Sequence, residues 1–229
     1  MISNQDPIDV IDFYNTPGMA RQYYKDFYGK NNLWPINILE PVVYQKLPEY
    51  LRPQNGLMVD LGCGPGNIIN RMVDVFKFKE VFAVDVSTEM ISFVNEQLPK
   101  NDIKVETQVA DLRYDNLDVA SNSADLVISF YAMPYLNELE KMFSEVERVL
   151  KKNRLFIFDL IVHSENNVET LPVFGGSLPL WQFFYHNNQI ISLLNKNNFL
   201  CLYRYDLDYR PRKQDPINAE HYLYFLMKQ

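Results

Sequence analysis

The sequence predicts an α/β fold: a doubly wound, seven-stranded mixed sheet with an N-terminal helical cap. From Leu57 onward, short apolar runs alternate with stretches of helical period, which is typical of parallel βαβ units. These apolar runs are nearly continuous, as expected for strands that are buried on both faces. The first 51 residues are helical by pattern and rich in aromatic side chains, so we expect them to lie outside the sheet.

Seven strands are expected, the last of them antiparallel, with helices in the alternating part. The strands span Leu57 to Leu61, Glu80 to Asp85, Lys104 to Val109, Ala124 to Ser129, Leu155 to Leu160, Leu200 to Asp206 and His221 to Met227. The helices span Asn67 to Phe76, Thr88 to Leu98, Asn137 to Leu150 and about His186 to Lys196. We expect one domain over residues 1–229, with a cap or lid at 1–51, a core at 57–229 and a Gly- and Pro-containing insertion at about 163–185.

Composition restricts the classes of partner. Twenty-two basic and 29 acidic residues give a net charge of −7, which disfavours a nucleic acid backbone as a partner. Two cysteines make neither a disulfide framework nor a metal pattern, so we expect no metal. With no long uncharged apolar run and no basic leader, the sequence predicts a soluble, cytoplasmic protein without a membrane partner.

A glycine-rich turn joins the first strand to the first helix of the alternating part. Residues 60–67 read DLGCGPGN, and glycine lets a backbone approach a ligand closely. A dinucleotide fingerprint needs its third glycine at the sixth position from Gly62, where Asn67 stands. Asp60 would also sit poorly beside a pyrophosphate and well beside an ammonium group. The spacing therefore favours a cofactor other than a dinucleotide.

Residues 59–66, VDLGCGPG, resemble the first motif of class I S-adenosylmethionine-dependent methyltransferases, and small-molecule members resemble the chain most. The resemblance covers about Leu57 to Leu160 and implies a Rossmann-like fold with S-adenosylmethionine as cofactor. It implies that Asp85 accepts hydrogen bonds from the ribose, that Asp111 faces the adenine amino group and that the segment at Ser129 lies beside the methionine part. The cofactor-binding candidates are Asp60, Gly62, Cys63, Gly64, Gly66, Asp85, Val86, Asp111, Leu112, Ser129 and, from the N-terminal segment, Tyr23.

Each of these motif residues also has a structural interpretation. The glycine turn can be a tight connection, Asp85 an acid at a helix N-terminus, Asp111 a turn acid and Cys63 a compact core residue. One departure from the family is the turn at residues 151–154, KKNR, which lacks the usual glycine. The rival functions are a nicotinamide-dependent oxidoreductase and a non-catalytic S-adenosylmethionine-binding protein.

The sequence says less about the methyl acceptor than about the cofactor. Methyl transfer from a sulfonium needs positioning more than a base, so the absence of an obvious base does not exclude catalysis. Tyr131 and His163 are the catalytic candidates because they follow strands that end at the expected cleft. After the fourth strand the chain reads SFYAMPY, without the Asn/Asp-Pro-Pro-aromatic element of family members that methylate base amino groups. We expect a small-molecule acceptor, methylated on oxygen, nitrogen or carboxylate, and a monomer or homodimer.

Seven aromatic residues precede the first strand, and we expect some of them to cover the active site. They are Phe13, Tyr14, Tyr23, Tyr24, Phe27, Tyr28 and Trp34. Neighbours such as Tyr23 and Tyr24 must point in different directions on a helix, so a single packing face cannot take them all. The alternative is a helix that only packs against the sheet edge.

Overall fold

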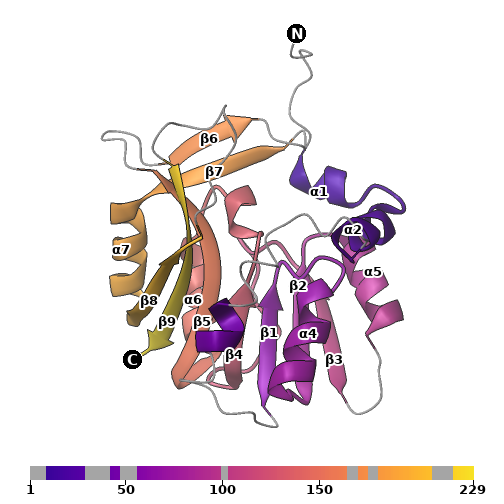
Figure 1. Ribbon diagram of the computed structural model, residues 1–229, viewed down its shortest axis with the longest axis horizontal. Helices are drawn as coiled ribbons and strands as arrows, with labels where there is room; N and C mark the ends of the chain where they lie inside the picture. Colours follow the sequence, from indigo (N-terminus) through magenta and orange to yellow (C-terminus); the bar gives the residue numbers. More distant parts are fainter. Residues whose placement is uncertain are drawn as a thin grey trace.

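The computed structural model describes residues 9–28, 42–46, 56–98, 103–163, 170–174, 180–207 and 219–229. A central sheet is covered on both faces by helices, with two short N-terminal helices over one end (Figure 1). The Rossmann-like fold predicted from the sequence is confirmed. The sheet has nine strands in this part of the chain, because the expected insertion contributes two that the sequence pattern did not predict.

The parallel half of the sheet determines where a ligand can bind. Its strands are β1 (Leu57–Leu61), β2 (Glu80–Asp85), β3 (Lys104–Val109), β4 (Ala124–Ser129) and β5 (Leu150–His163). They lie in the order β3-β2-β1-β4-β5. The chain builds outward from β1 to β3 and then returns to the other side of β1. In open α/β sheets, ligands bind at the carboxyl ends of the strands beside such a reversal, here between β1 and β4.

Helices cover the sheet in two layers because alternate strand residues point to opposite faces. The helices are α4 (Asn67–Phe76), α5 (Thr88–Gln97), α6 (Glu140–Val149) and α7 (Asn187–Lys196). Met58 of β1 shares a core with α4 and α5, whereas its neighbour Val59 packs in the core of α6 and α7. This alternation makes the sheet doubly wound.

The far side of the sheet is antiparallel. Strand β9 (Ala219–Lys228) pairs with β5 from Leu155 to His163, and β8 (Phe199–Asp206) pairs with β9. The additional strands β6 (Thr170–Phe174) and β7 (Trp181–His186) form a hairpin that joins the end of β5. Pro172 is tolerated in β6 because β6 pairs only with β7, so one side of the strand needs no ladder hydrogen bonds. A proline inside a run argues against a strand in sequence analysis, so the sequence pattern did not predict β6.

Two helices of the N-terminal segment, α1 (Val10–Tyr14) and α2 (Met19–Tyr28), pack against α5. Asn15 Oδ1 accepts hydrogen bonds from Ser87 Oγ and Thr88 Oγ1, both at 3.0 Å. The Gly18 amide donates to Glu89 Oε1 at 2.8 Å. These bonds hold the turn between α1 and α2 at the start of α5, directly after the end of β2. A further helical stretch covers residues 42–46.

Candidate functional site

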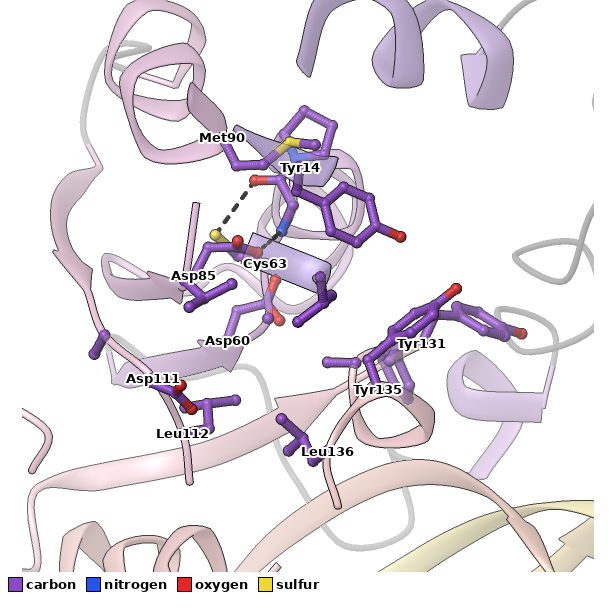
Figure 2. A pocket seen from close by; sticks show the side chains of 18 of the residues that line it. Tyr14, Asp60, Cys63, Asp85, Met90, Asp111, Leu112, Tyr131, Tyr135 and Leu136 are labelled. Carbon is purple, nitrogen blue, oxygen red and sulfur yellow. Dashed lines mark hydrogen bonds between the residues drawn. The ribbon is translucent and has the colours of Figure 1, made fainter. Parts of the chain in front are cut away.

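One cavity lies over the carboxyl ends of β1, β2 and β4, at the reversal of strand order (Figure 2). Its volume is about 1000 Å³ with the open mouth included, which accommodates a nucleoside-sized ligand and a small second molecule. Most of the cofactor-binding candidates line it: Asp60, Gly62, Cys63, Gly64, Asp85, Val86, Asp111, Leu112 and Tyr23. Tyr131 lines it too, but Gly66, Ser129 and His163 do not.

The glycine turn places bare backbone at the cavity wall. Gly62 and Gly64 have φ values of 73° and 52°, in the left-handed region that favours glycine. A Cβ at Gly62 would lie 2.2 Å from that of Ala132, so there the chain approaches the segment after β4 too closely for a side chain. A Cβ at Gly64 would meet nothing within 4 Å. Because Gly64 lines the cavity, its side-chain position is space available to a ligand.

Asp85 ties this turn to the end of β2. Its Oδ2 accepts the Gly64 amide and its Oδ1 accepts the Ser87 amide, both at 2.9 Å. Burial raises the pKa of the Asp85 carboxyl, and hydrogen bonds from these amides oppose the rise. Ser87, whose Oγ accepts the Met90 amide, is the N-cap of α5. Asp85 is therefore not the helix cap, and its carboxylate borders the cavity instead.

Asp60 is a buried carboxylate at the end of β1. It is 2% exposed, and its Oδ2 has no hydrogen-bond partner among the described residues. Burial, with a smaller contribution from the nearby Asp85, raises the pKa of this carboxyl to about 8. A buried carboxylate is costly unless a cation or donor pairs with it. An ammonium group in the cavity would satisfy Asp60, so the residues present fit a cofactor that carries one.

Asp111 follows β3, and the structure gives it a partner that the sequence did not reveal. Arg113 binds both carboxylate oxygens, with Nη2 at 2.6 Å from Oδ2 and Nε at 2.9 Å from Oδ1. Burial raises the pKa of Asp111, but the hydrogen bonds and charge of Arg113 outweigh it and leave the pKa below its ordinary value. The Arg113 amide also donates to Oδ1 at 3.0 Å, so Arg113 holds the carboxylate through both its backbone and its side chain. Asp111 is thus held ionised at the cavity rim.

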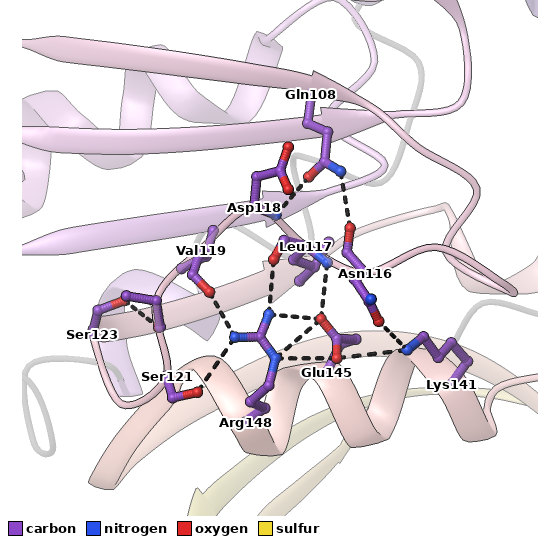
Figure 3. Close-up of polar contacts among 11 residues, drawn as sticks. Gln108, Asn116, Leu117, Asp118, Val119, Ser121, Ser123, Lys141, Glu145 and Arg148 are labelled. Carbon is purple, nitrogen blue, oxygen red and sulfur yellow. Dashed lines mark hydrogen bonds and ion pairs between the residues drawn. The ribbon is translucent and has the colours of Figure 1, made fainter.

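The segment after Asp111 is fixed from below by α6 (Figure 3). The Leu117 amide donates to Glu145 Oε2 at 2.8 Å, and Arg148 donates to the carbonyls of Leu117 and Val119 at 2.8 and 2.7 Å. Arg148 also forms an ion pair with Glu145 at 2.7 Å. A loop that would otherwise leave buried carbonyls unpaired is held in one position. Neither residue reaches the cavity, so their role here is support.

Ser129 belongs to the sheet and not to the cavity wall. It is fully buried, and its Oγ donates to the Leu61 carbonyl at 2.9 Å. The wall is instead made by Phe130, Tyr131 and Ala132, which follow it. His163 is 1% exposed at the end of β5, with its ring 5.7 Å from that of His186. The structure therefore places His163 away from the cavity lining and Tyr131 in it.

Tyr131 adopts an unusual backbone conformation that two buried residues support. Its φ is 59°, which costs energy for a residue with a side chain. Its amide donates to Asp159 Oδ1 at 2.7 Å, and the other oxygen of Asp159 lies 2.6 Å from His221 Nε2. The rings of Tyr131 and His221 meet edge to face at 5.9 Å. Neither Asp159 nor His221 was a candidate from the sequence.

Three more tyrosines line the cavity. Tyr14 and Tyr23 come from the N-terminal helices, and Tyr135 comes from the 3-10 turn Met133–Tyr135. The Tyr14 ring meets those of Tyr23 and Tyr135 edge to face at 6.0 and 6.1 Å. Tyr135 was not a candidate from the sequence. The side chains of Phe27, Tyr28 and Trp34, expected in the same cover, lie outside the described residues.

Two further features concern other classes of site. Within the described ranges, no group of three or more His, Cys, Asp or Glu side chains is arranged to hold a metal ion. None of the helices in that part of the chain combines the length and apolarity needed to span a bilayer.

Comparison with known proteins agrees with this geometry. Residues 59–158 match a family model described as a methyltransferase domain. A protein of Invertebrate iridescent virus 6 whose name places it among the methyltransferases, 235L, is 28% identical over 134 residues, which are 58% of this chain and 47% of that protein. The malonyl-[acyl-carrier protein] O-methyltransferase of Hahella chejuensis is 36% identical over 95 residues, 41% of this chain and 32% of that enzyme. The chain thus spans less than half the length of these curated relatives.

A solved structure extends the likeness to nearly the whole fold. The S-adenosylmethionine-dependent methyltransferase from Clostridium acetobutylicum superposes with a TM-score of 0.64 at 19% identity. The match covers 91% of this chain and 97% of that one. At this identity the likeness concerns the fold, including the sheet whose strand ends build the cavity.

Proposed function

We propose that the chain, whose residues 59–158 match a methyltransferase domain, transfers a methyl group from S-adenosylmethionine to a small-molecule acceptor. The observation that carries the proposal is the carboxylate of Asp60, buried beside the glycine turn with one oxygen unpaired in the described chain. A cationic ligand would stabilise the ionised form of such a group. The cavity offers it a position at the reversal of strand order, where this fold binds ligands.

Different lining residues would bind different parts of the cofactor. When bound, the cofactor supplies a methyl group activated on a sulfonium. We propose that Asp60 binds its ammonium group, that Asp85 accepts hydrogen bonds from its ribose and that Asp111 with Leu112 faces the adenine. The Gly62–Gly64 backbone leaves the space that such a ligand needs. Positioning two reactive groups in a water-poor cavity supplies most of the acceleration, so these residues need no acid–base role.

A nicotinamide-dependent oxidoreductase is the rival enzyme, and the charges of the site disfavour it. A pyrophosphate would lie over the same glycine turn, beside the carboxylates of Asp60 and Asp85. Like charges in a buried site repel strongly, because little water screens them. A non-catalytic cofactor-binding protein would have a closed or filled acceptor side, whereas this cavity extends past the turn to four tyrosines.

Calorimetry tests the proposal directly. Titration with S-adenosylhomocysteine, S-adenosylmethionine, NAD and NADP should show binding of the first two and none of the last two. A radiolabelled methyl group from S-adenosylmethionine should then appear in a small-molecule fraction after incubation with candidate acceptors. Tight binding of NAD, with no binding of S-adenosylhomocysteine, would overturn the assignment.

A further inference from the structure

The cavity wall carries an excess of negative charge that bears on the acceptor. Its acidic and basic side chains, among the described residues, are Asp85, Asp111, Arg113 and Asp60, and the Asp60 carboxyl, with its pKa raised to about 8, is protonated at neutral pH until a cation pairs with it. Arg113 is fully engaged with Asp111 through a bidentate ion pair. A carboxylate or phosphate acceptor would thus find no available cation in the described part of the wall. An acceptor without negative charge meets no such penalty.

The acceptor side of the cavity is a cluster of tyrosine rings, which we call the tyrosine cluster: Tyr14, Tyr23, Tyr131 and Tyr135. Burial raises the pKa of Tyr14, Tyr23 and Tyr135, so their hydroxyl groups stay protonated and neutral. The hydroxyl groups of Tyr14 and Tyr135 are hydrogen-bonded to each other. Figure 2 shows Tyr14, Tyr131 and Tyr135 on the side of the cavity away from Asp111. Neutral aromatic rings present negative π faces, which attract cations.

The carboxyl groups of Asp85 and Asp159 also favour a cation near the tyrosine cluster. The charges of both Asp85 and Asp159 act on the Tyr23 hydroxyl, and the charge of Asp159 acts on Tyr135. Asp159 is fully buried behind Tyr131, to whose amide it is hydrogen-bonded. The imidazole of His221 lies 2.6 Å from the other oxygen of Asp159. Two carboxyl groups thus act on the tyrosine cluster, which favours a positive ligand over a negative one.

From this geometry we propose that the acceptor is a tertiary aliphatic amine, which the enzyme converts to a quaternary ammonium product. The inference rests on the proposed methyltransferase function. The nitrogen lone pair forms the new N–C bond while the methyl carbon–sulfur bond breaks and leaves its electron pair on sulfur. The positive charge passes from the sulfonium to the ammonium, so one set of π faces attracts a cation before and after transfer.

The choice of a tertiary amine follows from the groups that line the acceptor side. An aliphatic tertiary amine must first lose its ammonium proton to solvent, because only the free base has a nucleophilic lone pair. The free base has no N–H, so the transfer step itself releases no proton and requires no general base. Histidine and lysine do not occur in the described lining of the cavity. A phenol would have to lose its oxygen proton in the cavity, and a primary amine would leave a product nitrogen that still carries protons to be removed.

The test uses a pair of probes of equal shape and different charge. The full-length protein is first titrated with S-adenosylhomocysteine, which tests the proposed function by itself. The saturated protein is then titrated with choline, with its neutral isostere 3,3-dimethyl-1-butanol and with the anion 3,3-dimethylbutanoate. We expect choline to bind about fivefold or more tightly than the alcohol, since cation–π contacts of this kind are worth that ratio or more. The anion should not bind measurably.

Variants of the tyrosine cluster locate the effect. Tyr135→Leu should reduce choline affinity to that of the alcohol, whereas Tyr135→Phe, which keeps the ring, should retain the preference. Tyr114→Leu, at a tyrosine that is 59% exposed and outside the cavity, is the matched control. Unchanged S-adenosylhomocysteine affinity in all three variants verifies the fold and the cofactor side.

The outcomes separate the two proposals. If S-adenosylhomocysteine does not bind, the methyltransferase function fails. If it binds but choline and the alcohol bind equally, or neither binds, or the anion binds best, the amine acceptor is wrong and the methyltransferase function stands. Methylation of 2-(dimethylamino)ethanol by the wild-type protein, reduced in Tyr135→Leu and retained in Tyr135→Phe, would support the inference further.

Discussion

The cofactor side and the acceptor side of the cavity are built in different ways. On the proposed cofactor side, Asp60, Asp85 and Asp111 lie at or just after the ends of three neighbouring parallel strands, within about fifty residues of sequence, and backbone amides hold Asp85. On the acceptor side, Tyr14, Tyr23, Tyr131 and Tyr135 come from segments far apart in the chain. Asp159 and His221 support this side from strands β5 and β9.

The difference predicts which substitutions disrupt each side. The shape of the proposed cofactor side depends on backbone geometry, so a single added side chain can block cofactor binding while the sheet remains intact. The shape of the proposed acceptor side depends on contacts between distant segments, so substitutions there should weaken cofactor binding only mildly. Four predictions test this contrast, and they run from the largest expected effect to the smallest.

Gly64→Val should abolish S-adenosylhomocysteine binding, with a loss of more than about a hundredfold, while the protein stays folded. The added side chain enters cavity space that a ligand needs, although a positive φ costs a β-branched residue about 1–3 kcal/mol of stability. Calorimetry and circular dichroism provide the measurements. Gly18→Val is the matched control, because Gly18 also has a positive φ and open space but lies outside the cavity lining. Normal binding by a folded Gly64→Val protein would show that the turn is only a connection.

Asp85→Ala should weaken S-adenosylhomocysteine binding by about 2–4 kcal/mol, because the ribose hydroxyls lose a charged acceptor and the Gly64 amide loses its partner. Asp125→Ala is the control. Asp125 is an equally buried carboxylate, paired with Lys151 and Arg154 at the opposite end of the sheet. Its loss should lower the melting temperature and leave affinity unchanged. An affinity for Asp85→Ala within threefold of wild type would assign Asp85 a purely structural role.

S-adenosylhomocysteine affinity should rise about tenfold per pH unit from pH 6 and level off near pH 8. Asp60, with its pKa raised to about 8, must lose a proton before it can pair with an ammonium group. Calorimetry in buffers of different ionisation enthalpy should detect about one released proton below pH 8. In the free protein, the raised folded pKa means that the unfolding free energy falls as pH rises from about 4 to about 8. Asp60→Asn should remove both dependences, and a wild-type affinity independent of pH would contradict the assignment.

Asn15→Ala should have the smallest effect, a threefold to tenfold weaker affinity for S-adenosylhomocysteine. Asn15 holds the N-terminal turn on Ser87 and Thr88, so its loss loosens the helices that present Tyr14 and Tyr23 to the cavity. Thr16→Ala, which removes only an exposed bond to the Asp12 carbonyl, is the control. If Asn15→Ala and Thr16→Ala bind alike, the N-terminal helices do not contribute to the cofactor side.

Local sequence pattern was sufficient for the parallel half of the fold. The four strands β1 to β4 and helix α4 begin and end where the apolar runs predicted. The pattern predicted β5 too short: β9 and β7 continue its ladder to His163, and at its start Leu150 pairs with Ala124 of β4. When a strand is lengthened by pairing with a segment far along the sequence, the hydrophobic pattern of that strand does not indicate the added residues.

The sequence by itself predicted the residues of the proposed cofactor side, because strand ends of parallel neighbours meet at one edge of the sheet and glycine spacing is a local property. Tertiary structure alone decided the proposed acceptor side. No periodicity could pair Asp159 with His221 or place the Tyr131 amide on that carboxylate. It also turned Ser129 into the sheet and placed His163 outside the cavity lining. These contacts depend on side chains from separate segments meeting in the folded chain, which local pattern does not encode.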